Sequence, residues 1–226
     1  MGSRAASRTA GSRRGPRLLA NLLLLAGAGL LVGPAAHYVT GVRSQAAASR
    51  ELRELSVGKP APGPGRAVPQ GEAVGRLELP RVGLDLAVFE GVSEATLRKG
   101  PGHIPGTACP GLASEPGNCV IAGHRDSFFS RLARAREGDI VRFRSGPEDR
   151  SYRLTSRRIV LPGNIEEMAP TPHERLTLIT CYPFDWTGSA PYRLIWEGSP
   201  LPLSTASVST APAAVPQTPE RQAATR

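Results

Sequence analysis

The stretch Leu176-Thr-Leu-Ile-Thr-Cys-Tyr-Pro-Phe184 combines the pattern of a buried strand with a thiol at its end. Its Leu, Ile and Thr residues favour a strand, and Pro183 cannot continue a central ladder because it has no backbone N–H. We therefore expect Cys181 at a strand end that opens into a loop, where rigid scaffolds expose reactive side chains. Taken alone, a cysteine in this position is more often a small buried hydrophobic residue.

Two further residues give this thiol a chemical context. His124 follows the apolar run Val120-Ile-Ala-Gly123, which is also a strand exit, and Arg193 lies in the later run Tyr192–Trp196. A thiolate attacks a peptide carbonyl, an imidazolium gives a proton to the departing amine, and a guanidinium stabilises the oxyanion. The three side chains together indicate covalent acyl chemistry.

Eight short apolar runs of strand length lie between residues 76 and 198, bounded by Gly, Pro, Asn and Asp. They are too closely spaced for alternating long helices, so the pattern predicts a mostly antiparallel β sandwich or barrel. The runs are Arg76–Leu79, Leu84–Phe89, Cys119–Ala122, Asp139–Phe143, Tyr152–Leu154, Arg158–Leu161, Leu176–Cys181 and Tyr192–Trp196. Residues 93–98 and 126–135 read as short helices, with N-caps at Ser93 and at Asp126 or Ser127.

The positive charge of the chain is concentrated outside this region. The formal net charge is +9, of which residues 1–75 carry +7, residues 76–198 carry +1 and residues 199–226 carry +1. A nucleic-acid-binding domain concentrates basic residues on its folded part. The nearly neutral region 76–198 therefore argues against a nucleic-acid partner.

An apolar run from Leu18 to Val39 follows a basic segment without acidic residues. At ~1.5 Å per residue it would cross a ~30 Å hydrocarbon core, and the preceding positive charge favours a cytoplasmic N-terminus. We predict a cytoplasmic tail (1–17), a transmembrane helix (18–39) and an exported domain. The competing interpretation is a cleaved secretory signal, with Ser12-Arg13-Arg14 as a twin-arginine element and cleavage near residues 33–36.

The segments on either side of the domain differ from it in composition. Residues 40–55 favour a short juxtamembrane helix that lifts the domain off the bilayer, and residues 56–75 form a linker rich in Pro and Gly. Residues 199–226 are rich in Ser, Thr, Ala and Pro and are expected to be disordered. The domain itself is expected to span residues 76–198.

Three cysteines divide naturally into a pair and a single thiol. Outside the cytoplasm, Cys109 and Cys119 could close a disulfide around residues 110–118, leaving Cys181 free and reactive. Three unrelated, reduced cysteines are the alternative.

Gly123-His124-Arg125-Asp126, Thr177-Leu-Ile-Thr-Cys181 and Ala190-Pro-Tyr-Arg193 together resemble the sortase family of membrane-anchored cysteine transpeptidases, and most closely its class D. The resemblance covers about residues 76–198. It implies an eight-stranded sortase-like β barrel, with Cys181 as nucleophile, His124 as general acid and Arg193 at the oxyanion. It also implies that Thr180 supports the oxyanion hole.

The resemblance further implies a substrate and partners. Sortases cleave an LPxTG-like or LPxTA-like C-terminal sorting signal and pass the thioacyl group to an amine, either of a cell-wall peptide or of a pilin lysine. No cofactor or metal is expected. A degenerate binding or assembly module and a membrane-tethered peptidase that only hydrolyses are the alternatives, although the intact trio argues against the former.

Overall fold

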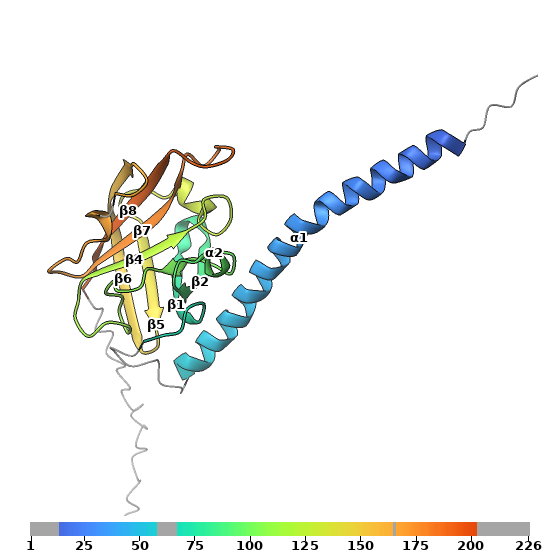
Figure 1. Cartoon of the computed structure of the whole chain (residues 1–226). Coiled ribbons are helices and arrows are strands. Elements are labelled where there is room, and N and C mark those ends of the chain that lie inside the picture. The colour runs from blue at the N-terminus through green and yellow to red at the C-terminus, as the bar shows by residue number, and fades with distance from the viewer. Residues whose placement is uncertain (1–13, 58–66, 165, 203–226) are drawn as a thin grey trace, which may run out of the picture.

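The computed structural model describes residues 14–57, 67–164 and 166–202. A long helix, α1 (Arg14–Val57), precedes a closed barrel of eight strands, so the predicted mostly-β barrel is confirmed (Figure 1). The predictions for the start of the basic tail (1–13), part of the linker (58–66) and most of the C-terminal segment (203–226) lie outside the described residues.

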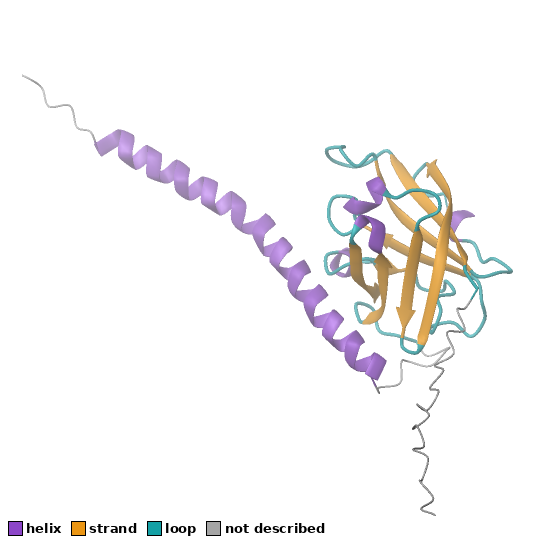
Figure 2. Cartoon of the chain, turned by 180° about the vertical axis from the view of Figure 1, so that it is seen from behind, coloured by secondary structure: helices purple, strands orange, loops and turns teal. Residues whose placement is uncertain are grey.

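The barrel is formed in the order β1-β2-β3-β4-β7-β8-β6-β5, and β1 pairs with β5 to close it. Figure 2 shows the strands wrapping around one core, with short helical turns at the edges. Two neighbouring pairs, β2–β3 and β4–β7, are parallel. The strands are β1 (Ala73–Leu79), β2 (Leu84–Glu90), β3 (Gly102–His103), β4 (Asn118–Gly123), β5 (Ile140–Ser145), β6 (Glu148–Val160), β7 (Arg175–Tyr182) and β8 (Tyr192–Pro200).

The core forms because alternate residues of each strand face the barrel interior. In β7, Leu176 and Leu178 are buried, and in β8 the buried side chains include Leu194 and Trp196. Each such side chain contributes about 1.5–3 kcal/mol by leaving water. This inward alternation determines which residues of β7 and β8 remain available for chemistry on the other face.

Two strand assignments differ from the sequence prediction. The run Tyr152–Leu154 and all but the last residue of the run Arg158–Leu161 belong to one strand, β6, because the polar residues between them pair with β8 across a register shift. The two-residue strand β3 was not predicted, since it is too short to carry a pattern and forms by pairing with the distant strands β2 and β4. The barrel also begins at Ala73 and ends at Pro200, slightly beyond the expected 76–198.

The two predicted short helices have different outcomes. Helix α2 (Glu94–Leu97) is present, and the Ser93 side chain caps it by accepting from the Thr96 N–H. Residues 126–135 do not form a capped α-helix: a turn is followed by the 3-10 helix η2 (Ser130–Arg134), whose N-cap is Phe129. The Phe129 side chain is fully buried, and its N–H donates to the His124 carbonyl, which bends the chain back over the end of β4.

The predicted membrane segment and juxtamembrane helix form one continuous helix. Among the described residues, the segment Leu19–Arg50 of α1 is long and apolar enough to cross a membrane, with a mean hydropathy of 1.9 in its most apolar window. Residues 40–55 are helical, as expected, but they continue the preceding helix and do not form a separate short one. This part of α1 packs against β1 and β2, where Ala48 is buried beside Ala87 and Phe89.

The cysteines divide into a bonded pair and one free thiol. Cys109 and Cys119 form a disulfide, and Cys181 is free and partly exposed. The disulfide ties the segment before β4 to the beginning of that strand. It lies four residues before the strand end that precedes His124, so it braces β4 rather than the reactive end.

A buried carboxylate joins two loops at the barrel edge. Asp139 accepts hydrogen bonds from the guanidinium of Arg81 and, at 2.8 Å, from the backbone N–H of Arg136. The Arg81 hydrogen bond is the main reason that the pKa of Asp139 lies below its usual range. Because folding lowers the pKa of Asp139, its ionised carboxylate stabilises the folded state. This contribution is complete above the unfolded-state pKa of about 4, and it is lost as the pH falls through the folded-state pKa.

We predict that Asp139→Asn destabilises the barrel by about 1–3 kcal/mol at pH 7, because a charge-assisted hydrogen bond to a buried group is lost. The loss of stability is measured from thermal unfolding curves, which are monitored by circular dichroism at several pH values between 3 and 7. The difference between wild type and variant should shrink below about pH 4. Equal melting temperatures at pH 7 would contradict the assignment.

Candidate active site

The parallel pairing of β4 and β7 brings two chemically active residues to the same end of the barrel. Gly123, the last residue of β4, pairs with Thr180 of β7. The next residue on each strand is His124 and Cys181. Because parallel strands end at the same edge of a sheet, the imidazole and the thiol lie side by side, as the matching strand exits predict.

Cys181 lies on the side of β7 that faces away from the core. Leu176, Leu178 and Thr180 share the inward face, and Cys181 has the opposite parity and is partly exposed. The thiol is therefore not one of the core hydrophobic residues. Its Cα partner on the antiparallel strand β8 is Arg193, and directly opposed residues project on the same face of the sheet.

The three residues line one cavity with a volume of about 310 Å³. Cys181, His124 and Arg193 share it with Arg125, Asp126 and residues 188–190 of the β7–β8 loop. The structure thus brings together a thiol, an imidazole and a guanidinium from three different strands or strand ends. A peptide carbonyl entering this cavity would meet all three groups.

Hydrogen bonds hold the Arg193 side chain, whereas the His124 ring has only a distant charged neighbour. Nη1 of Arg193 donates to the carbonyl oxygens of Tyr192 at 2.9 Å and Ala190 at 3.3 Å, which holds the guanidinium against the loop beside Cys181. Nε2 of His124 lies 3.9 Å from a carboxylate oxygen of Glu94 at the start of α2. Glu94 is exposed, so water screens this pair and its energetic contribution is small.

Thr180 connects the two reactive strand ends. Its hydroxyl donates to the Gly123 carbonyl at 2.8 Å, and its side chain is only 2% exposed. The hydroxyl proton is therefore committed to β4 and faces the interior of the barrel, not the cavity. This geometry fits a residue that sets the spacing between Cys181 and His124 better than one that donates to an oxyanion.

Gly123 is required by close packing at the end of β4. A Cβ atom at this position would lie 2.8 Å from the ring of Phe129. The absence of a side chain lets Phe129 cover the strand end and closes the turn that carries His124. The glycine before the histidine is therefore required for packing, because it has no Cβ atom.

Arg125 is a site residue that the sequence interpretation did not single out. It is 9% exposed, and its Nη2 donates to the carbonyl oxygens of Trp186 at 2.7 Å and Gly188 at 2.9 Å. Its Nε is also buried and has no hydrogen-bond partner among the described residues. Arg125 therefore holds the β7–β8 loop over the cavity, and its position directly after His124 was the only signal in the sequence.

Another histidine, His103, has a structural place. It is buried in β3, with Nδ1 2.7 Å from a carboxylate oxygen of Glu90 and Nε2 3.0 Å from the hydroxyl of Thr107. These residues border a separate cavity of about 550 Å³ near the start of β4, away from Cys181. No cluster of three or more potential metal ligands occurs within residues 14–57, 67–164 and 166–202.

Comparison with known proteins shows the family of the chain. The sequence model of the sortase domain matches residues 77–201, which is more than half of the chain. The chain belongs to the sortase family. Sortase D of Bacillus subtilis (strain 168) is 35% identical over 130 residues, which cover 57% of this sortase and 64% of that protein. The match supports the resemblance to class D, although this sortase spans less than two thirds of the length of that relative.

Solved structures show the same fold. The Sortase D5 transpeptidase of Clostridium perfringens is 17% identical with a TM-score of 0.58, and the match covers 72% of this sortase and 99% of that chain. Sortase C of C. perfringens, solved with the C-terminal cell wall sorting motif, is 24% identical with a TM-score of 0.54, covering 69% and 86% of the two chains. At these identities the likeness concerns the barrel alone.

We predict that Arg125→Ala and Arg125→Lys reduce kcat/KM for a donor peptide about tenfold or more, because each breaks the clamp on the β7–β8 loop. Hydrogen bonds to charged groups contribute about 1.5–3 kcal/mol, and 1.4 kcal/mol corresponds to a factor of ten. Arg131→Ala is the matched control, since Arg131 also donates to a backbone carbonyl, that of Gly83, but does not line the cavity. Unchanged kinetics in both Arg125 variants would refute the clamp.

Proposed function

We propose that this sortase is a single-pass membrane transpeptidase. Residues 1–17 lie in the cytoplasm, residues 18–39 cross the cytoplasmic membrane, and the barrel acts outside the cell on proteins with an LPxTG-like or LPxTA-like C-terminal sorting signal. The observation that carries the catalytic proposal is the single cavity shared by Cys181, His124 and Arg193. The exposed apolar surface of α1 supports the anchor.

The reaction begins at the thiol. The thiolate of Cys181 attacks the carbonyl carbon of the scissile bond, which follows the threonine of the signal, and forms a tetrahedral oxyanion. Collapse of this intermediate breaks the C–N bond, and the imidazolium of His124 transfers its proton to the departing amine. A thioacyl enzyme remains. An acceptor amine then attacks the thioester, loses a proton to His124 and releases the thiolate.

Arg193 is placed to stabilise the charge that develops on the substrate oxygen. It projects from β8 on the same face as its partner Cys181, and two backbone carbonyls hold its guanidinium beforehand. A preorganised donor costs little reorganisation when the oxyanion forms. Thr180 acts indirectly, by holding the strand ends of Cys181 and His124 in register.

The partners follow from this chemistry. The donor is a protein whose sorting signal enters the cavity, and C. perfringens sortase C has been solved with such a motif. The acceptor is a primary amine, of a cell-wall peptide or of a pilin lysine. A peptidase that only hydrolyses would use the same residues, and the product formed with added amine separates the two functions.

We predict a covalent adduct on Cys181 when the full chain in detergent is incubated with LPxTG and LPxTA peptides. Intact-protein mass spectrometry should show the mass of the cleaved acyl fragment on the wild type and none on Cys181→Ala. An added amine should remove the adduct and appear in the product. A folded protein with a free thiol and no adduct with either peptide would favour a binding module instead.

We further predict that Arg193→Ala and Arg193→Lys lower the acylation rate by about 10²–10³, the range found for removal of one oxyanion donor. Lysine keeps the positive charge but lacks the planar guanidinium that the carbonyl oxygens of Ala190 and Tyr192 hold in place. The acylation rate is measured by quenching the reaction at a series of times, at saturating peptide, and quantifying the Cys181 adduct. Arg157→Ala is the matched control, since Arg157 stacks on the Tyr182 ring outside the cavity. Wild-type rates in both Arg193 variants would exclude this role.

A further inference from the structure

The C-terminal part of α1 is docked on the barrel by specific contacts. The Gln45 side chain accepts from the Ala87 N–H at 2.8 Å and donates to the Ala87 carbonyl at 3.0 Å. It also donates to the Lys99 carbonyl at 3.0 Å, and Gly100 leaves room for it because a Cβ there would clash with the amide. This pairing with both backbone groups of Ala87 gives the helix a defined position on β2.

One contact between α1 and the barrel lies beside the catalytic end. Gly41 is buried, and a Cβ on it would lie 3.2 Å from both the Phe128 ring and the Arg98 carbonyl. Phe128 belongs to the turn that begins at His124 and closes with the Phe129 N–H to His124 carbonyl bond. Going from Gly41 to Ala48, the helix descends from this end of the barrel along β2.

The charge pattern places the membrane boundary at the same level of the helix. No charged residue occurs from Leu18 to Val42, and Arg43 is the first basic residue after the apolar run. Val39 and Arg43 are about 6 Å apart along the helix axis, which is comparable to the thickness of a headgroup layer. Gly41 therefore lies where the helix leaves the hydrocarbon core and also where it meets Phe128.

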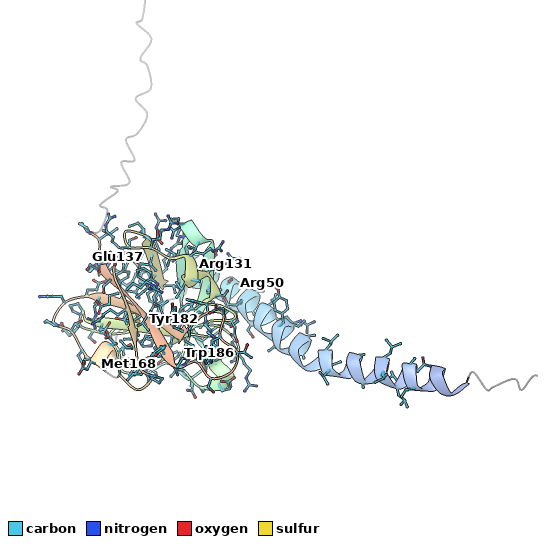
Figure 3. The ribbon with its side chains drawn as sticks, turned by 90° about the horizontal axis from the view of Figure 1, so that it is seen from above. Arg50, Arg131, Glu137, Met168, Tyr182 and Trp186 are labelled. Carbon is cyan, nitrogen blue, oxygen red and sulfur yellow. A yellow bond between two sulfur atoms is a disulfide. The ribbon has the colours of Figure 1, made fainter. Side chains whose placement is uncertain are left out.

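The β7–β8 loop carries an exposed aromatic side chain at this end. Trp186 is 50% exposed, its indole N–H donates to the Ser189 carbonyl within the loop, and Arg125 holds its backbone. Figure 1 shows this loop at the end of the barrel toward which the N-terminal part of α1 extends, and Figure 3 places Trp186 on the helix side, opposite Glu137. Indole rings favour the headgroup layer of a bilayer.

We propose that the docked helix α1 holds the catalytic mouth of the barrel against the lipid surface, with Trp186 in the headgroup layer. This inference rests on the proposed membrane anchor and goes beyond it, because an anchor alone leaves the barrel free to point in any direction. The cavity of Cys181, His124 and Arg193 then opens toward the bilayer. It receives a polypeptide segment directly where that segment leaves the membrane.

Tryptophan fluorescence provides a direct test, because the chain has two tryptophans and Trp196 is buried in the core. The full chain is reconstituted in phosphatidylcholine vesicles with bromine atoms either high on the acyl chains or near the bilayer centre. Bromines high on the chains should quench emission strongly, and central bromines should quench it less. Trp186→Phe should abolish this quenching and leave only the emission of Trp196.

An undocked variant, Gly41→Leu with Gln45→Ala, removes the hydrogen bonds and forces α1 away from Phe128. In this variant the bromines should no longer quench Trp186, whereas the emission of the buried Trp196 should remain as in the wild type. The matched control substitutes exposed neighbours on the same helix, Val42→Leu with Ala46→Gln, and should behave as wild type.

The outcomes separate the orientation from the function on which it rests. If the protein floats with the vesicles but the bromines do not quench Trp186, the proposed orientation is wrong and the membrane anchor stands. Failure to float with vesicles would overturn it together with the membrane anchor. Formation of the Cys181 adduct in detergent reports on catalysis in either case. Equal quenching in the docked and undocked proteins would also overturn the proposal, because the dock would then not determine the orientation.

Discussion

The parallel pairing of β4 and β7 is the constraint on which the active site depends. Gly123 opposite Thr180, with the Thr180 hydroxyl bonded to the Gly123 carbonyl, fixes the relative height of the two strand ends. A slip of one residue would turn Cys181 into the core and move it away from His124. The other elements of the site, including the antiparallel strand β8 with Arg193, are arranged around this pair.

The loops at this end are held by buried side chains and backbone hydrogen bonds. Phe129 packs on Gly123 and closes the turn that carries His124, whereas Arg125 grips two carbonyls of the β7–β8 loop. Both contacts are made by residues within six positions of His124. A short segment of sequence therefore shapes two sides of the cavity.

Helix α1 has two surfaces with different environments. Its N-terminal part is apolar and exposed, as a lipid-facing helix requires, and its C-terminal part buries Gly41 and Ala48 against the barrel. Small residues at these positions let the helix approach closely, and the Gln45 amide hydrogen-bonds both the N–H and the C=O of Ala87 in β2. The helix is thus part of the folded domain as well as a candidate anchor.

The sequence by itself determined the β class and the apolar N-terminal helix, because each rests on a local pattern. It also singled out Cys181 and His124 through their places at strand ends, whereas Arg193 stood out through the resemblance of its motif to the sortase family. Only the tertiary structure decided the short strand β3, the clamp by Arg125, the inward hydroxyl of Thr180 and the docking of α1. These features depend on contacts between residues far apart in the chain, and neither periodicity nor composition records which distant backbone groups a side chain will meet.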